Sequence, residues 1–209
     1  MIQDSLNPPA DGLMKNYMDV NTGPLMVTDD MKELGYKNTF LAGFFEPGSP
    51  LLQKIDTPAN TRTDINTNPD FYNQTVPSEI GDLLAKIYRC ATFDGAEHTL
   101  FGGQVTHEEC RTMVDNLLSN RMGALIEVGT SVEAQVAHKH GWTNALDGLI
   151  HSISDVGIVY SPGGNYVLVI FIYSENQILF DHGNLLFARL SQSIYNAYNP
   201  YQQAIVYTE

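Results

Sequence analysis

A basic cluster in an acidic chain is the first candidate for chemistry. His138, Lys139 and His140 are consecutive, in the sequence Ala-His-Lys-His-Gly-Trp, whereas the 209-residue chain has a net charge of -13. An ammonium group and imidazoles attract anions, and imidazole is also a common metal ligand. The cluster therefore predicts an anion-binding site, with a metal site as the alternative.

The elements that would carry this cluster have the pattern of antiparallel strands. Residues 136–140, 156–160 and 166–173 are rich in β-branched and aromatic side chains, and Gly, Pro and Asn lie between them. Such runs predict three hairpin strands. A helix is expected over 181–199, with its apolar face on the sheet. This face is predicted from residues at a spacing of about 3.6 and one neighbour, namely Leu186, Leu190, Ile194 and Ala197, with Phe187 beside them.

The metal alternative rests on strand alternation, which places His138 and His140 on one face. A third ligand would have to come from elsewhere in the chain. The candidates are His98, His107, His151 and His182, and none of them has a diagnostic spacing.

The order of these segments resembles a known superfamily. Lys-His-Gly-Trp, a Gly-Ile-Val-Tyr strand, a very apolar strand and a long C-terminal helix are similar to the last third of the serine β-lactamases and penicillin-binding proteins (DD-peptidases), in a class A β-lactamase-like form. In that family the first strand carries Lys-Thr-Gly or a variant and lines the active site. The resemblance implies that Lys139 binds the substrate carboxylate and lowers the pKa of neighbouring hydroxyls.

The residues after Lys139 extend the resemblance and also depart from it. Gly141 would let a ligand backbone approach closely, and the resemblance implies that the backbone N–H of Trp142 donates to an oxyanion. His140 replaces the usual Thr or Ser. An imidazole can still donate a hydrogen bond to a carboxylate, but it is bulkier and titrates near neutrality, which predicts a pH dependence of ligand binding.

A second motif lies at the other end of the chain. Ser5-Leu6-Asn7 is similar to the family's Ser-Asp-Asn loop in the form Ser-x-Asn. The resemblance implies that Ser5 relays a proton and that Asn7 orients the substrate. From the residues alone, the segment also has the composition of a polar loop before a helix, since Asn before Pro is a common turn signal.

The family's nucleophile motif is missing. In the family, a Ser-x-x-Lys helix precedes the Ser-x-Asn loop, but none of the six lysines here has serine three positions before it. The resemblance therefore covers nearly all of this chain but only the later part of the family's domain. We expect a fragment, or one half of a two-chain enzyme, that does not catalyse the reaction alone.

Residues 43–77 predict a long surface loop, because they contain most of the prolines and little periodicity. The resembling enzymes have their Ω-loop here, with an Arg-x-Glu whose carboxylate activates the deacylating water. Arg62-Thr63-Asp64 is the nearest match, and Asn66 or Asn68 would help to hold a water. Asp64 is one methylene shorter than Glu, which weighs against penicillinase-style deacylation. An ordinary solvated Arg–Asp pair is the alternative.

Four further helices are expected in the first two thirds of the chain. Pro8 and Pro9 suit the start of a helix to Met18, with a buried stripe of Leu13, Met14, Tyr17 and Met18. Thr28 would cap residues 29–34. A helix from about Pro77 to Cys90 follows the loop, with Ile80, Leu83, Leu84 and Ile87 on one face. Thr106 and Glu109 form a capping-box pattern at the start of a helix to about Ser119.

Composition and charge limit the classes of partner. The chain is 43% hydrophobic and 17% charged, as expected for a globular protein. Its strong negative charge argues against nucleic acid and anionic membranes as partners, and its longest apolar run, residues 166–173, has strand length. Cys90 and Cys110 are expected to be small buried apolar residues, with a disulfide between them as the alternative.

The sequence therefore predicts an α+β fold of the β-lactamase/transpeptidase type, with helices on an antiparallel sheet and the N-terminal part of the domain missing. One incomplete domain would cover 1–209, with a mainly helical part over 1–133 and the strands and last helix over 134–209. The resemblance implies a serine hydrolase that acts on a β-lactam or related amide, needs no cofactor, and is secreted or periplasmic. A non-catalytic binding or scaffold protein is the alternative. Exposed apolar surface would favour self-association or a complementing N-terminal polypeptide.

Overall fold

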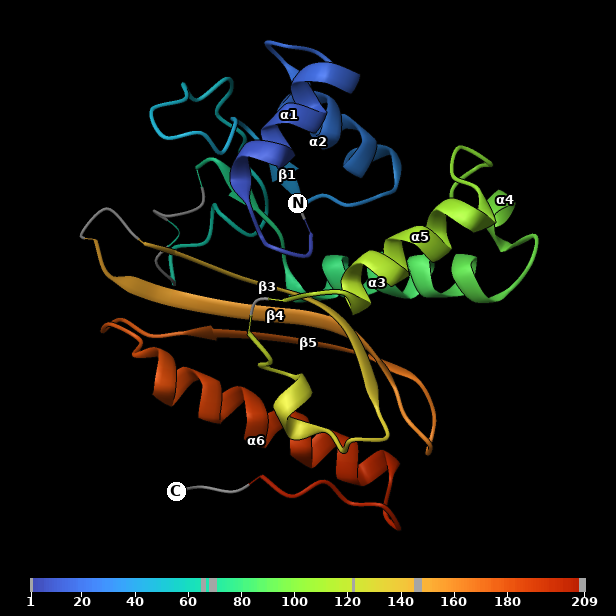
Figure 1. The fold of residues 1–209 in the computed structure, drawn as a ribbon. Coiled ribbons are helices and arrows are strands. Elements are labelled where there is room, and N and C mark those ends of the chain that lie inside the picture. The colour runs from blue at the N-terminus through green and yellow to red at the C-terminus, as the bar shows by residue number, and fades with distance from the viewer. Residues whose placement is uncertain (1, 65–66, 68–70, 122, 145–147, 207–209) are drawn as a thin grey trace. The chain divides into compact units, whose positions relative to one another are not determined.

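The computed structural model describes residues 2–64, 67, 71–121, 123–144 and 148–206. The contacts divide the chain into two compact units, residues 3–80 and residues 81–209. Figure 1 labels the elements of both units. Because the positions of these units relative to one another are not determined, each is described by itself.

The first unit contains two helices and a two-stranded sheet. Helix α1 (Asn7–Tyr17) has proline in its first turn, as predicted, and helix α2 is Gly23–Glu33. Strands β1 (Phe40–Leu41) and β2 (Asn73–Gln74) pair antiparallel. The long stretch between these strands is irregular over its described residues, which confirms the predicted loop there.

Two predictions about these helices are wrong. Leu13 and Tyr17 are exposed in α1, and the buried residues are Met14 and Asp11. The Asp11 carboxylate accepts hydrogen bonds from the backbone N–H groups of Phe45 and Glu46, both at 2.8 Å, so a polar side chain anchors this helix. Thr28 lies inside α2 rather than at its start.

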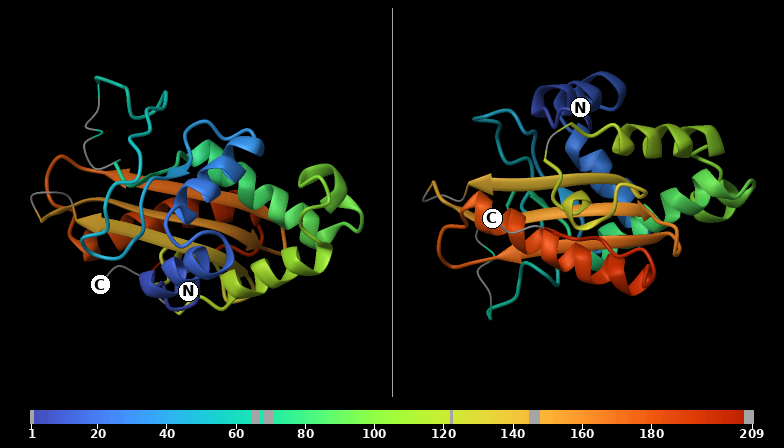
Figure 2. Two further views of the ribbon diagram at one scale, coloured as in Figure 1. Left: turned by 90° about the horizontal axis from the view of Figure 1, so that it is seen from above. Right: turned by 60° about the horizontal axis from the view of Figure 1, so that its bottom comes forward.

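The second unit is built around a three-stranded antiparallel sheet in the order β3-β4-β5. Its strands are β3 (Gln135–Asn144), β4 (Ile150–Tyr160) and β5 (Tyr166–Tyr173). All three predicted strands are confirmed, and β3 and β4 are longer than predicted. Figures 1 and 2 show helices on both faces of this sheet, which confirms the α+β class.

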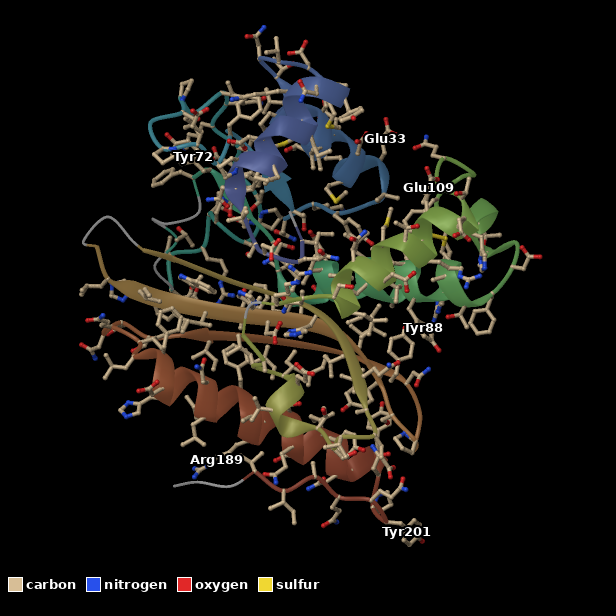
Figure 3. The ribbon with its side chains drawn as sticks, viewed as in Figure 1. Glu33, Tyr72, Tyr88, Glu109, Arg189 and Tyr201 are labelled. Atoms are coloured by element: carbon tan, nitrogen blue, oxygen red, sulfur yellow. A yellow bond between two sulfur atoms is a disulfide. The ribbon has the colours of Figure 1, made fainter. Side chains whose placement is uncertain are left out.

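One face of the sheet packs against α3 (Pro77–Thr92) and α5 (His107–Leu118), with the short α4 (Ala96–Leu100) between them in the chain. A Cβ placed on Gly81 in α3 would lie 3.2 Å from the Val169 side chain of β5. The ring of Tyr88, labelled in Figure 3, lies 5.9 Å from the ring of Tyr160. Helix α5 begins with the predicted capping box of Thr106 and Glu109.

The other face carries the main core beneath helix α6 (Phe180–Tyr198) and the 3-10 helix η1 (Glu127–Gly129). Val136, Ile153 and Val159 from the strands pack there with Ile126 and Phe187. Gly129 is needed where η1 meets α6, because an added Cβ would lie 2.4 Å from the carbonyl oxygen of Ala188.

The predicted face of α6 is wrong. Leu186, Leu190 and Ile194 are each at least 40% exposed, and Ala197 is exposed too. The buried residues are Gly183, Phe187, Ala188, Ser191 and Tyr195. Arg189, labelled in Figure 3, is among the exposed residues of this helix. The helix therefore presents small and polar groups to the core and an apolar row to the outside.

The expectation that the cysteines are unpaired is also wrong. Cys90 at the end of α3 and Cys110 in α5 form a disulfide, with their Cα atoms 5.8 Å apart. Both residues are fully buried, so the bond fixes two helices of the second unit to one another. Among the described residues, no helix is both long and apolar enough to cross a membrane.

Candidate functional site

Strand β3 is the edge strand of the larger sheet, and it divides the basic cluster between two faces. Lys139 lies opposite Val156 and His140 opposite Asp155 in the register with β4. Because successive side chains of a strand alternate, Lys139 and Gly141 belong to one face. His138, His140 and Trp142 belong to the core face, where Ile153 is the partner of Trp142. The sequence placed these residues in one cluster, and the strand separates their chemistry.

Lys139 is a half-buried cation beside the strand edge. Its Nζ donates a hydrogen bond to the carbonyl oxygen of His140 at 2.8 Å. Burial lowers the pKa of Lys139, and the opposing influence is the negative charge of Asp155. A partly desolvated ammonium interacts more strongly with an anion than a fully hydrated one does, so this geometry suits the predicted anion-binding role, which stays a prediction.

Gly141 follows on the same face. Its carbonyl oxygen accepts a hydrogen bond from the Ser154 hydroxyl at 3.3 Å. A Cβ placed on Gly141 would lie 3.4 Å from that hydroxyl oxygen, which is an ordinary contact. The glycine thus keeps this part of the face open without being demanded by the sheet.

His140 is buried, with 3% of its surface exposed. Neither of its ring nitrogens has a hydrogen-bond partner among the residues that the structure describes. Burial, followed by the charge of Lys139, lowers the pKa of His140 to about 4, against the opposing charge of Asp155. The expectation that His140 titrates near neutrality is therefore wrong, and the ring is neutral at pH 7.

Trp142 stacks on His140. The ring centroids are 5.0 Å apart and the planes differ by 9°, and Phe180 from α6 meets Trp142 edge-on at 5.3 Å. These three rings border a cavity of about 180 Å³. Residues 123–125 and Val128 from the segment around η1, and Asn184 from α6, complete its lining.

A buried hydrogen-bond network holds the strand that carries these residues. Nδ1 of His138 lies 2.9 Å from both carboxylate oxygens of Asp155, and its Nε2 lies 3.0 Å from Nδ2 of Asn120. The backbone N–H of Ile126 donates to Asp155 at 2.9 Å. The carbonyl oxygen of Ile126 in turn accepts from the Ser191 hydroxyl of α6 at 2.7 Å.

The network bears on the metal alternative, because both ring nitrogens of His138 already have partners. Over the part of the chain that the structure describes, no group of three or more His, Cys, Asp or Glu side chains is placed to hold a metal ion. The structure therefore gives His138 a structural partner in Asp155, and nothing in its described residues favours a site with His140.

The other predicted site residues belong to the first unit. Ser5 is half-buried, with a φ of 49°, in the turn before α1, and Asn7 is the exposed first residue of that helix. The Asp64 carboxylate accepts a hydrogen bond from Nε of Arg62 at 2.9 Å. This bond lowers the pKa of Asp64, and both side chains are exposed. Asn66 and Asn68 lie outside the described residues.

Sequence reasoning missed Asp155, Asn120 and the lining of the cavity. Asp155 follows Ser154 in an apolar run, and an acid flanked by strand residues was the available signal for a buried partner. The lining of the cavity comes from three separated segments. No periodicity in a single sequence predicts that these segments meet.

Comparisons with known proteins identify the family. Residues 9–198 match the model of the β-lactamase enzyme family. The chain belongs to this family. A search of curated proteins finds no significant match.

Solved structures of β-lactamases and a related protein share the fold. The TLA-1 extended-spectrum β-lactamase has a TM-score of 0.64 at 19% identity, with 93% of this chain and 60% of that chain covered. A class A β-lactamase from Bacteroides cellulosilyticus has a TM-score of 0.63 at 18% identity, covering 95% and 61%. PBP-A has a TM-score of 0.59 at 18% identity, covering 85% and 52%. The chain thus spans only about half to three fifths of the length of these structures.

Proposed function

We propose that this family member forms the substrate-binding part of a β-lactamase-like serine hydrolase whose nucleophile lies on another polypeptide. The substrate would be a β-lactam or a related amide that carries a carboxylate. PBP-A, one of the structural neighbours, has been solved as an acyl-enzyme complex with penicillin G. Family and fold support the hydrolase type, and the proposal adds the division of labour between chains.

The observation that carries the proposal is the position of Lys139. This ammonium is half-buried on an edge strand, next to a glycine, in a chain whose net charge is -13. A fixed, partly desolvated cation binds a carboxylate and stabilises negative charge on neighbouring groups. Lys139 would hold the substrate carboxylate, while the edge of β3 at Gly141 and the backbone N–H of Trp142 would face the reacting carbonyl.

The reaction would proceed through a covalent intermediate. A serine from the complementing polypeptide would attack the amide carbonyl, the C–N bond would break, and the leaving nitrogen would take a proton. Water would then hydrolyse the acyl-enzyme. In this scheme Ser5 relays the proton and Asn7 orients the substrate. Asp64 would replace the glutamate that activates water, with the shorter reach noted above.

The complementing polypeptide would cover apolar surface that this chain leaves exposed. Leu186, Leu190 and Ile194 form an outward row on α6, and β5 is the last strand in the order of the described sheet. The neighbouring structures contain additional chain length that has no counterpart here. We therefore propose a complementing segment as the occupant, and a second copy of this chain would be the contrary outcome.

A second candidate function is a non-catalytic binding or scaffold protein. The observation that favours it is the absence of Ser-x-x-Lys from the full sequence. Such a protein would bind a carboxylate ligand at Lys139 without turning it over. The Cys90–Cys110 disulfide supports a secreted or periplasmic location under either function, because disulfides persist in oxidising compartments.

The test of the carboxylate site is binding of benzylpenicillin to the purified chain, measured by NMR titration. Lys139→Gln should weaken binding about tenfold, as expected for loss of one charge-assisted contact. Lys86→Gln is the control, because Lys86 is a partly buried lysine that pairs with Asp82 on α3. Equal affinity of the Lys139→Gln variant and the unaltered chain would contradict the proposal.

A further inference from the structure

The cavity behind Trp142 contains a polar group that the protein does not satisfy. His140 lines the cavity and is almost completely buried, and both its ring nitrogens lack a partner among the described residues. A buried polar group without a hydrogen bond destabilises the folded state. Two such atoms in one ring, at the wall of a cavity, indicate a place for a ligand that forms hydrogen bonds with them.

The size and lining of the cavity define the shape of that ligand. Its volume is about 180 Å³, and a dry apolar cavity of about 150 Å³ is known to hold benzene. Trp142 and Phe180 supply aromatic surfaces at right angles, with an interplanar angle of 86°, and Leu125 and Val128 add aliphatic ones. A single six-membered ring fits this combination of flat and apolar walls.

The charges around the cavity select against an anion. No lysine or arginine is among the described residues that line it, and the low pKa of His140 keeps the imidazole neutral at pH 7. A neutral imidazole offers one donor and one acceptor. A hydroxyl group matches this pair, because it also donates and accepts, whereas a carboxylate would be buried without a countercharge.

We propose that this cavity is a binding site for a neutral aromatic ring that carries a hydroxyl group, with His140 as its hydrogen-bond partner and Trp142 as its stacking surface. The site lies on the core face of β3, opposite the face of Lys139. It is therefore independent of the carboxylate site, and it stands whether or not the chain takes part in hydrolysis.

The experiment compares three fluorinated probes by fluorine NMR at pH 7, with the emission of Trp142 as a second readout. Trp142 is the only tryptophan in the chain, so its emission reports on this cavity alone. Para-fluorophenol should bind about tenfold more tightly than fluorobenzene, which lacks the hydroxyl, because tenfold corresponds to one net hydrogen bond. Para-fluorobenzoate should bind more weakly than para-fluorophenol.

Two variants distinguish the hydrogen bond from the space. His140→Phe keeps the ring and removes both nitrogens, so the affinity for para-fluorophenol should fall about tenfold to that for fluorobenzene. Ala124→Leu fills the cavity from an exposed position and should abolish binding of both neutral probes. Ala134→Leu is the matched control, since Ala134 is not part of the lining.

The result that would overturn the proposal is absence of saturable para-fluorophenol binding to the unaltered chain. Equal affinities for para-fluorophenol and fluorobenzene would overturn the role of His140. Retained binding in the folded Ala124→Leu variant would show that the probe occupies a different site. Benzylpenicillin binding through Lys139 should be unaffected by Ala124→Leu, which separates a failure here from a failure of the proposed hydrolase function.

Discussion

The carboxylate of Asp155 and the imidazole of His138 form a buried pair at 2.9 Å, with 0% and 2% of their side chains exposed. The pair joins β4 to β3, and the hydrogen bond from Ile126 joins the segment before η1 to the same carboxylate. His138 immediately precedes Lys139. The pair therefore fixes the part of the edge strand that carries the candidate site.

Removal of this carboxylate should destabilise the second unit. Asp155→Ala would leave the Ile126 N–H and the His138 ring without their partner, and we expect the free energy of unfolding to fall by about 3 kcal/mol. Urea denaturation measures this change. Asp115→Ala, at an exposed position of α5, should change it by less than about 0.5 kcal/mol. Similar effects of the two variants would refute the structural role of the pair.

Reduction of the disulfide should also lower stability. The cysteines are separated by 20 residues, and closure of a loop of that length is worth about 3 kcal/mol in the chain-entropy model. The paired Cys90→Ser and Cys110→Ser variant should unfold at lower urea than the oxidised protein. Dithiothreitol should lower the midpoint of the unaltered chain but leave the variant unchanged. A free-thiol count of two in the native protein would contradict the bond itself.

His140 should give the protein an acid-sensitive transition. Its pKa is about 4 in the folded state, against about 6.5 in an unfolded chain. The unfolded state therefore binds the proton first as pH falls, so stability should decrease between about pH 6.5 and 4, by up to about 3 kcal/mol. The folded protein should show a change in Trp142 emission near pH 4.

Two controls define this titration. His140→Phe should abolish the emission change, because the stacked ring can no longer become charged. It should also flatten the dependence of stability on pH between about 6.5 and 4. A midpoint near pH 6.5 in the unaltered protein would show that His140 is hydrated and contradict its burial.

The apolar row on α6 predicts association through this helix. Leu186→Glu and Leu190→Glu together place charges on exposed positions, so the chain should fold normally and lose binding to its complementing polypeptide. Sedimentation of the native preparation measures the assembly. Leu13→Glu, at an exposed leucine of α1, tests whether any added charge has the same effect. A native preparation that sediments as a monomer of this chain alone would contradict the prediction.

The order of the elements could be predicted because local signals were strong. The β-branched runs predicted all three strands of the larger sheet, and the reciprocal bonds of Thr106 and Glu109 exist as the capping pattern implied. Family resemblance then supplied the α+β class. These features depend on neighbours in the sequence, which a single chain reveals.

The face of α6 could not be predicted from apolar spacing. Its buried side includes Gly183, which approaches Ile153 closely, and Ser191, which bonds to the Ile126 carbonyl. Tyr195 is buried with its hydroxyl 2.7 Å from the Ser131 hydroxyl. Small and hydrogen-bonded residues thus occupy the core side, while the more regular row of leucines lies outside. Hydrophobic periodicity alone favours the leucines.

The site was predicted in part for the same reason. Lys139 and Gly141 lie on the edge strand where the motif placed them, but the neutral state of His140 depends on burial by segments distant in the sequence. The disulfide has a similar origin, because α3 and α5 bring the two cysteines together. The roles of Ser5, Asn7 and Asp64 stay predictions, since these residues belong to a unit that is described separately.

The most direct test of the central claim is intact-mass analysis of the native preparation after incubation with a reporter penicillin. The account predicts that this chain keeps its unmodified mass and that a penicilloyl adduct appears on a second polypeptide that carries the nucleophile. A stable adduct on this chain would place the nucleophile here and contradict the division of labour. A preparation with no adduct on any chain would contradict the hydrolase and favour the non-catalytic binding protein.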